Sequence, residues 1–313
     1  MEDKIENVNA KFLRAIRKFS GDVFMMLGGP PRQPFSSAGK RAALSDPRGN
    51  LVYEYIRLIS EVCPRFFVFE NVANLVTATL RHRKIKDRPG QNWNLKLYEN
   101  DKLNNQDDTS PLKPEELSGS AIRQILKDFS SLGYKTVFRV LDAAKYGTPQ
   151  YRLRFIMIGV RDSIPPQLSE PTHGAPEYGL LPFVTLRDVI ADLGSNPGPH
   201  SEYTDALAFY FRLIPPGGNW RNLPEHLKEE AMGTSYASGG GKTGFYRKLD
   251  WDAPSPTITG RANRKASAIC YPEYTRPLSV SECARIQGFP GSLSESSRIT
   301  TRQTQVVRKS SIY

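Results

Sequence analysis

The 313-residue chain is predicted to have an α/β fold, in which a mostly parallel sheet flanked by helices is followed by a smaller, irregular and strand-rich domain. Strand-like and helix-like segments alternate through the first half of the chain, which is the pattern of parallel strands joined by helical crossovers. The alternation stops near residue 163, and Pro, Gly, aromatic and basic residues then become frequent as far as about residue 275. Short strands and long loops are expected in that region.

The elements of the first half follow from the spacing of their apolar residues. Residues 1–19 have the pattern of a mixed-charge amphipathic helix, and "NLVYEYIRLISEV" (50–62) and "AIRQILKDFSSLG" (121–133) also have helical spacing. Because helices join the strands, the strands should be parallel and a ligand should bind at their carboxyl ends. The predicted strands are "GDVFMMLGG" (21–29), "RFFVFENV" (65–72), "KTVFRVL" (135–141) and "RFIMIGVR" (154–161).

A polar stretch over residues 81–120 interrupts this pattern, and we interpret it as an insertion. The composition, with 39% hydrophobic and 24% charged residues, is ordinary for a globular protein. No apolar run approaches the ~20 residues that a membrane span needs, and the N-terminus lacks a signal-peptide core. We therefore expect a cytoplasmic protein with no membrane partner.

The charge of the chain suggests an anionic partner. The net charge is +11 and the isoelectric point is near 9.5, and the commonest anionic partner of such a protein is a polyphosphate backbone. Cys63, Cys270 and Cys283 are odd in number and far apart, without a CxxC pair. Neither a disulfide framework nor a metal site is therefore expected.

Five short stretches stand out because of their order along the chain. Each has an ordinary explanation when taken alone, such as a proline-rich turn or a basic strand. In this order they resemble the fourth, fifth, sixth, eighth and ninth motifs of the DNA cytosine-5 methyltransferases, over about residues 23–290. The stretches are "GGPPRQPFS" (28–36), "DPRGNLVYEYIRLI" (46–59), "FENV" (69–72), "QYRLR" (150–154) and "RPLSVSECARIQGFP" (276–290).

The resemblance implies a partial doubly wound, Rossmann-like sheet of the S-adenosylmethionine-dependent methyltransferases. The catalytic domain would cover residues 1–162, without the early cofactor strands, and would regain residues 276–290. A target-recognition, DNA-binding domain would cover 163–275, and 291–313 would form an atypical tail. Without the early strands, one sheet edge is expected to be unpaired.

The resemblance also implies the reaction and its residues. Cytosine C5 is a poor nucleophile, so a thiolate adds to C6 while a carboxyl group engages N3, and C5 then attacks the methyl group of S-adenosylmethionine. The cytosine must first be flipped out of double-stranded DNA. Glu70 would be the N3 partner, and Arg152 and Arg154 would hold the flipped base. Pro31 and Leu51 are the expected cofactor contacts.

Arg32 departs from the family pattern at its centre. The family has its nucleophilic cysteine between the second proline and the glutamine, where this chain has Arg32. A guanidinium stays protonated and has no lone pair to offer C6. Cys63 lies seven residues before Glu70, at the opposite end of the predicted strand, and we interpret it as a packing residue.

Two further motifs of the family are missing from the 313 residues. No glycine-rich cofactor turn precedes Gly28, and no Gly-Asn pair follows "IQGFP". We therefore expect a truncated and inactive homologue from a restriction-modification system, with doubtful binding of S-adenosylmethionine. The alternative is a non-catalytic DNA-binding protein, or one subunit of a split methyltransferase whose partner supplies the missing motifs.

The region before the ninth motif mixes basic residues with aromatics and threonine, as expected for a surface that holds phosphates and reads bases. A solvated basic face would have the same composition, so both interpretations stay open. The candidate segments are "NWRNLP" (219–224), "GFYRKLDWDAPSPTITGR" (244–261) and "RANRK" (261–265).

Overall fold

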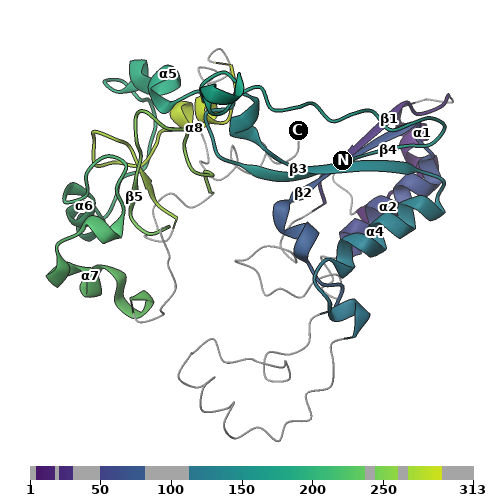
Figure 1. Cartoon of the computed structure of the whole chain (residues 1–313), viewed down its shortest axis with the longest axis horizontal. Helices are drawn as coiled ribbons and strands as arrows, with labels where there is room; N and C mark the ends of the chain where they lie inside the picture. Colours follow the sequence, from purple (N-terminus) through teal and green to yellow (C-terminus); the bar gives the residue numbers. More distant parts are fainter. Residues whose placement is uncertain are drawn as a thin grey trace, which may run out of the picture. The chain divides into compact units, whose positions relative to one another are not determined.

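The computed structural model describes residues 5–17, 21–30, 50–81, 113–236, 244–259 and 267–290. The chain divides into two compact units (Figure 1). The first unit consists of residues 1–140 and 154–168, and the second of residues 141–153 and 169–313. The predicted domain roles, including the return of residues 276–290 to the catalytic domain, stay predictions.

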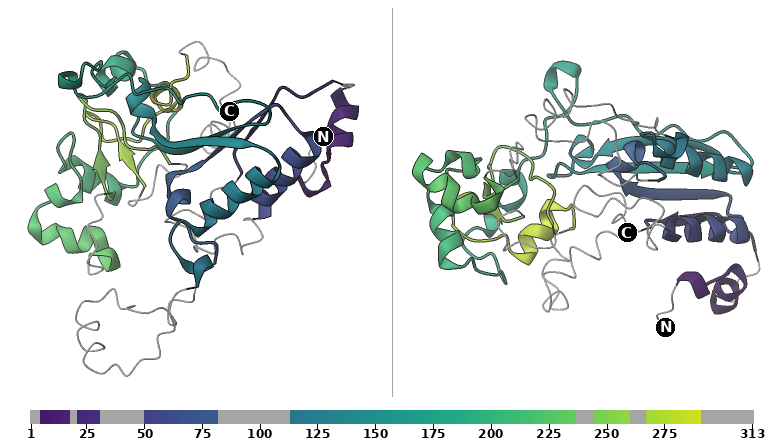
Figure 2. Two further views of the ribbon diagram at one scale, coloured as in Figure 1. Left: turned by 45° about the vertical axis from the view of Figure 1, so that its right-hand side comes forward. Right: turned by 90° about the horizontal axis from the view of Figure 1, so that it is seen from below.

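Each helix and strand expected in the first half of the chain is present. The N-terminal helix pattern forms a short 3-10 turn, Ile5–Asn7, and then α1, which lies against α2 (Figure 2). Residues 82–112 of the expected insertion at 81–120 lie outside the described part. The last residue of the expected insertion, Ser120, is the first residue of α4. The elements are α1 Ala10–Arg17, β1 Met25–Gly28, α2 Asn50–Val62, β2 Phe66–Val72, α4 Ser120–Ser131, β3 Lys135–Asp142 and β4 Leu153–Val160.

These strands form one mixed sheet in the order β1-β2-β4-β3. β1 and β2 are parallel, as predicted, but β4 runs antiparallel to β2, so the expectation of parallel strands is wrong for β4. β3 and β4 are neighbours joined by residues 143–152. A parallel pair needs a crossover of a dozen or more residues, usually a helix, whereas this short segment lets the chain turn straight back.

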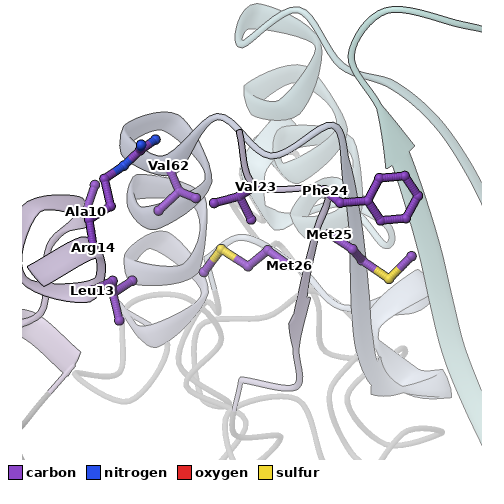
Figure 3. Close-up of a pocket in the computed structure, with 8 residues that line it drawn as sticks. All are labelled: Ala10, Leu13, Arg14, Val23, Phe24, Met25, Met26 and Val62. Atoms are coloured by element: carbon purple, nitrogen blue, oxygen red, sulfur yellow. The ribbon is translucent and has the colours of Figure 1, made fainter. Parts of the chain in front are cut away.

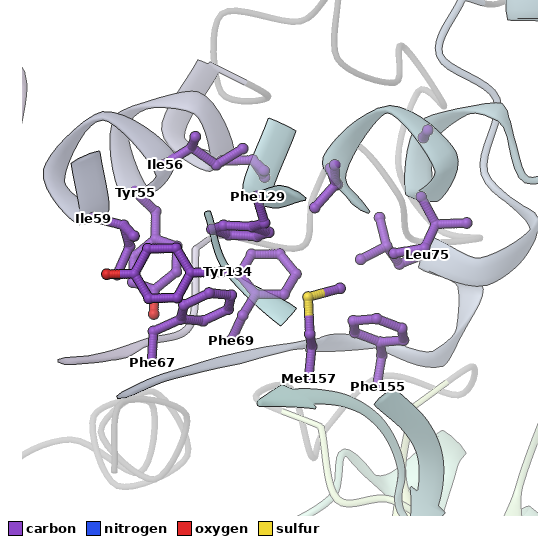
Figure 4. Close-up of a cluster of buried hydrophobic side chains, with 14 residues drawn as sticks. Tyr55, Ile56, Ile59, Phe67, Phe69, Leu75, Phe129, Tyr134, Phe155 and Met157 are labelled. Atoms are coloured by element: carbon purple, nitrogen blue, oxygen red, sulfur yellow. The ribbon is translucent and has the colours of Figure 1, made fainter. Parts of the chain in front are cut away.

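One face of the sheet packs on α2 and α4 (Figure 4). Alternate residues of β2 and β4 point to this face, because side chains along a strand alternate between faces. The rings of Phe67 and Phe129 stack with centroids 4.2 Å apart, and both side chains are fully buried. The buried cluster consists of Val52, Tyr55, Ile56, Ile59, Phe67, Phe69, Leu75, Ala121, Ile122, Ile125, Phe129, Tyr134, Phe155 and Met157.

Gly28 lets α2 approach the end of β1. A Cβ atom at Gly28 would lie 2.1 Å from Cε2 of Tyr55, which is too close for any larger residue. The Tyr55 hydroxyl lies within hydrogen-bonding distance of two strand carbonyls, at 3.2 Å from Met26 O and 2.9 Å from Val68 O. Burial raises the pKa of Tyr55, so the hydroxyl keeps its proton and joins the helix to both strands.

The second unit has its own apolar clusters and mostly short elements. Its strands are short, as expected, but most of its described regular structure is helical rather than strand. None of the described helices in either unit is long and apolar enough to cross a bilayer. The main elements are α5 Leu186–Ile190, α6 Asp205–Arg212, α7 Glu225–Met232, the parallel pair β5 Arg247–Lys248 and β6 Ile269–Cys270, and α8 Val280–Ile286.

β1 lies at one end of the described strand order, and its Leu27 is 71% exposed, while Phe24, directly before the strand, is 62% exposed. An exposed apolar edge is a template for pairing with another chain, and a lysine on it opposes pairing. We expect Leu27→Lys to lower self-association in sedimentation velocity without lowering Tm, because Leu27 buries little surface. Ile164→Lys is the control, since Ile164 is 84% exposed but lies outside the strands. Equal association of both variants and the unaltered chain would contradict this role of the edge.

Candidate functional site

Glu70 and Arg154 meet at the point where β2 ends and β4 begins. In the antiparallel register Glu70 lies opposite Ile156 and Val72 lies opposite Arg154. Residues two apart on a strand share a face, so Glu70 and Arg154 are diagonal neighbours on the face opposite the α2 and α4 core. Arg154 Nε lies 2.8 Å from Glu70 Oε1, and the two side chains form an ion pair.

The two partners of this ion pair differ in exposure. The Arg154 side chain is 16% exposed and the Glu70 side chain 38% exposed. A largely buried guanidinium is stabilised by a carboxylate beside it. The contact with Arg154 uses Oε1 of Glu70, and more than a third of the Glu70 side chain is exposed. The carboxylate can therefore bind a donor on a ligand while Arg154 holds its other oxygen.

Asn71 ties this strand end to the proline-rich loop. Its side chain is 1% exposed, and Nδ2 donates to Pro30 O at 3.3 Å while Oδ1 accepts the N–H of Val72 at 2.9 Å. The start of the loop is thus held next to Glu70. Arg32 and Pro31, the predicted nucleophile position and cofactor contact, lie outside the described residues. The sequence motifs gave Asn71 no role, although a polar side chain directly after a strand carboxylate was a usable signal.

Arg152 belongs to the second unit, as do the residues that hold its backbone and its guanidinium. Its backbone N–H donates to Asp142 Oδ1 at 2.8 Å, and its carbonyl accepts the N–H of Ala143 at 3.1 Å. Its guanidinium Nη1 lies 3.4 Å from Gln150 Oε1. The structure therefore brings Glu70 and Arg154 together within the first unit, whereas Arg152 lies in the second.

The described residues do not define a cofactor or metal site. Leu51, the second predicted cofactor contact, is half-buried at the start of α2 and offers an apolar contact alone. In the part of the chain that the structure describes, no three His, Cys, Asp or Glu side chains gather as metal ligands do. Among the described residues, the chemistry of this site therefore depends on Glu70 at the end of β2 and Arg154 at the start of β4.

An apolar pocket of about 650 Å³ lies in the first unit, at the other end of the strands (Figure 3). It is lined by the start of β1 and by Val62 at the end of α2, and Arg14 is its charged lining residue. Ligands of open α/β sheets bind at the carboxyl ends of the strands, where Glu70 lies. The pocket is therefore a poor candidate for the reaction site. Its lining residues are Ala10, Leu13, Arg14, Val23, Phe24, Met25, Met26 and Val62.

None of the three cysteines is placed to replace the missing nucleophile. Cys63 is exposed but precedes β2, and the strand residues from Phe66 to Glu70 alone span about 13 Å. Burial raises the pKa of Cys270 to about 11 and that of Cys283 to about 12. Both buried thiols stay protonated at neutral pH and are poor nucleophiles.

We expect a thiol reagent such as dithiobisnitrobenzoate to label Cys63 rapidly at pH 8, the half-buried Cys283 slowly, and the buried Cys270 only after unfolding. The folded-state pKa values of Cys270 and Cys283 lie above the unfolded value, so their contribution to stability is present below about pH 9 and is lost as the pH rises towards 11 to 12. Cys63→Ser is the control and should abolish the rapid phase. Two or three rapidly labelled thiols in the native protein would contradict the burial.

A second ion pair organises the start of α8. Arg276 Nη2 lies 2.8 Å from Glu282 Oε1 and Nη1 lies 2.9 Å from Oε2, with the Glu282 side chain fully buried. Glu282 also accepts the N–H of Ser279 at 2.7 Å, and the Ser279 hydroxyl accepts the N–H of Glu282. This capping box begins the helix. The Ser-x-x-Glu spacing inside the ninth-motif stretch was a usable sequence signal for this helix start.

The proposed basic surface is only partly outward-facing. Arg247 is half-buried and Lys248 is 9% exposed, and burial lowers the pKa of Arg247. Arg221 lies over the Trp220 ring, with its Cζ atom 5.6 Å from the ring centroid. The segment 261–265 lies outside the described residues. A role of these segments in reading DNA stays a prediction.

The chain is similar in sequence to a family of DNA methylases and to several Type II methyltransferases. The family model of the C-5 cytosine-specific DNA methylases matches residues 2–88 and 114–308. The Type II methyltransferase M.PspPI of Psychrobacter sp. (strain TA137) is 35% identical over 296 residues, which cover 93% of this chain and 60% of that protein. M.Eco47II of Escherichia coli is 34% identical over 279 residues, covering 87% of this chain and 57% of that protein.

M.Sau96I of Staphylococcus aureus is 31% identical over 272 residues, covering 86% of this chain and 53% of that protein. The chain thus spans between about half and three-fifths of the length of these curated relatives. Among solved structures, the methyltransferase EhMeth of Entamoeba histolytica has a TM-score of 0.50 at 12% identity, covering 97% of this chain and 75% of that one. This likeness concerns the fold alone.

Proposed function

Because the chain belongs to the C-5 cytosine-specific DNA methylase family, we propose that it binds double-stranded DNA and holds an extruded cytosine at the carboxyl end of β2. The observation that carries this proposal is the ion pair of Glu70 and Arg154, in which the Glu70 side chain is 38% exposed and so accessible to a ligand. The net charge of +11 favours a polyanionic partner. The similarity to Type II methyltransferases supports a function in a restriction-modification system.

Members of this family take their methyl group from S-adenosylmethionine, and the residues of this chain act on the cytosine. The base has to leave the helical stack, because its reacting atoms are buried there. The Glu70 carboxyl group accepts a hydrogen bond from the N4 amino group of the base and passes a proton to ring N3, which stabilises the charge that develops on the ring. Arg154 keeps the Glu70 carboxylate in place and donates to an oxygen acceptor of the flipped nucleotide. The family resemblance gives Arg152 the same kind of acceptor.

Arg32 prevents the covalent step in this proposal. The step forms a bond from a nucleophile to C6, and the electron pair of the C5–C6 double bond makes C5 nucleophilic. A protonated guanidinium has no electron pair for that bond. The chain is therefore proposed to bind DNA without transferring a methyl group.

A second candidate function follows from the same residue. Arg32 also fits a non-catalytic DNA-binding protein, or the subunit of a split methyltransferase in which another chain supplies both the cofactor motifs and the nucleophile. Mixing with a chain that carries the motifs and a nucleophilic cysteine separates the two. Methyl transfer by the mixture would favour the split enzyme, and its absence with DNA binding intact would favour the non-catalytic protein.

The covalent step can be tested without the cofactor, because addition at C6 alone makes C5 exchange its hydrogen with solvent. We expect the unaltered chain to release no tritium from mixed-sequence DNA labelled at cytosine C5. Arg32→Cys should release tritium well above background, since it supplies the missing thiol. Adding Glu70→Gln to that variant should lower the release about 100-fold or more, because the carboxyl partner of N3 is lost.

The controls for this experiment are Arg32→Ser, which removes the guanidinium without supplying a thiol, and Cys63→Ser in the Arg32→Cys background. Arg32→Ser should stay inactive and Cys63→Ser should leave the release unchanged. Methyl transfer from labelled S-adenosylmethionine by the unaltered chain would refute the proposal that Arg32 disables it.

DNA binding itself should depend strongly on salt. The net charge of +11 favours phosphate contacts that release counterions, so log K should fall linearly with log salt concentration. Fluorescence anisotropy with a short labelled duplex between about 50 and 200 mM salt measures this slope. An affinity that stays constant over this range would contradict a phosphate-based mode of binding.

A further inference from the structure

The loop between β3 and β4 is closed at its base by three hydrogen bonds. The N–H of Ala143 donates to the carbonyl of Arg152 at 3.1 Å. The N–H of Arg152 donates to Asp142 Oδ1 at 2.8 Å, and the N–H of Ala144 donates to the same oxygen at 3.3 Å. One carboxylate oxygen thus accepts from both ends of the loop.

The hydrogen bond between Asp142 and Arg152 is not part of the local turn that Asp142 begins. An aspartate that accepts the N–H two residues later begins many turns, and here it begins the 3-10 turn Ala143–Tyr146. Its bond to Arg152 joins residues ten apart in sequence. Hydrogen bonds from a backbone N–H to a carboxylate are shorter and stronger than those to a neutral acceptor. Asp142 therefore anchors the backbone of Arg152.

The other side of the loop is held by buried contacts with Ser255. The N–H of Tyr151 donates to Ser255 O at 2.8 Å, and the N–H of Ser255 donates to Pro149 O at 2.9 Å. Gln150 and Ser255 are both fully buried, and Gln150 Oε1 lies 3.4 Å from Arg152 Nη1. Arg152 is thus restrained at its backbone by Asp142 and at its guanidinium by Gln150.

We propose that Asp142 is a positioning residue for Arg152, which it presents to an oxygen acceptor of DNA, either a phosphodiester oxygen or the O2 of a pyrimidine. Asp142 does not touch DNA itself. A preorganised arginine loses less conformational freedom when it binds than one on a free loop, so the anchor raises affinity. This inference rests on the proposed function, because it requires that the chain binds DNA.

The test is a double-mutant cycle in the full 313-residue chain, with affinity for a short mixed-sequence duplex measured by anisotropy at several salt concentrations. We expect Arg152→Ala and Asp142→Ala each to weaken binding about tenfold. The double variant should bind no more weakly than Arg152→Ala, since Asp142 acts through Arg152. Asp142→Asn should retain most of the affinity, because its amide oxygen can accept the same two N–H groups.

Two further variants separate positioning from folding and from charge. Asp142→Ser can still accept the N–H of Ala144 but does not reach Arg152, so it should weaken binding like Asp142→Ala while keeping the native Tm. Glu116→Ala is the matched control, because it also removes one negative charge and one acceptor, for the N–H of Lys113 at 2.9 Å, but in the first unit. Its affinity should stay unchanged.

The salt dependence identifies the acceptor. Loss of a phosphate contact lowers the slope of log K against log salt by about 0.9, whereas loss of a contact to pyrimidine O2 leaves the slope unchanged. Either result, with the non-additive cycle, supports the positioning role.

Three results would overturn the inference, and they are distinguishable from failure of the proposed function. If Asp142→Ala keeps its affinity while Arg152→Ala loses affinity, or if the effects add in the double variant, Asp142 does not position Arg152. The DNA contact of Arg152 would then still stand. Unchanged affinity of Arg152→Ala would show that there is no bound arginine to position. If the unaltered chain does not bind DNA, the proposed function fails, and the inference fails with it.

Discussion

The antiparallel pairing of β4 with β2 is the constraint on which the candidate site depends. Because β4 runs against β2, its first residues lie beside the last residues of β2, and Arg154 is placed across from Val72. A parallel β4 would put Arg154 beside the amino end of β2, more than a strand length from any ligand bound at the carboxyl ends. The short connection over residues 143–152 that reverses the chain also holds Gln150 and Arg152. The reversal of the chain therefore sets the position of Arg154 beside the end of β2.

Two of the ion pairs, Glu70–Arg154 and Glu282–Arg276, show how a structural pair differs from one that is accessible to a ligand. Glu282 is fully buried, accepts both nitrogens of Arg276 and caps α8, so no lone pair faces solvent. Glu70 is 38% exposed, and Arg154 holds one of its oxygens. Removing either carboxylate would take away an ion-pair contact of a largely buried arginine, which is costly. Of these two carboxylates, Glu70 is the one that both pairs with a largely buried arginine and is exposed enough to accept a further hydrogen bond.

In the proposed function, one side chain, Arg32, limits the chemistry of the site rather than the fold. The strand end, the carboxylate and the arginine beside it are in place, and Asn71 holds the start of the loop that continues to Arg32. The two buried cysteines are protonated at neutral pH, and Cys63 lies beyond the opposite end of β2. In this sheet Cys63 is separated from Glu70 by the length of the strand from Phe66, so the proposed function makes covalent chemistry depend on the residue at position 32.

The sequence by itself determined the family, the helices and strands of the first half, and the pair of residues Glu70 and Arg154, because apolar periodicity and ordered motifs are local patterns. It wrongly predicted the direction of β4, since strand direction depends on the path of the chain between strands rather than on the strand's own residues. It also counted Arg247 and Lys248 among outward-facing basic residues, although they turn inward. Only the tertiary structure decided that Glu70 and Arg154 share a face at 2.8 Å and that Asp142 anchors Arg152, because both contacts depend on strand register and loop closure between residues far apart in sequence.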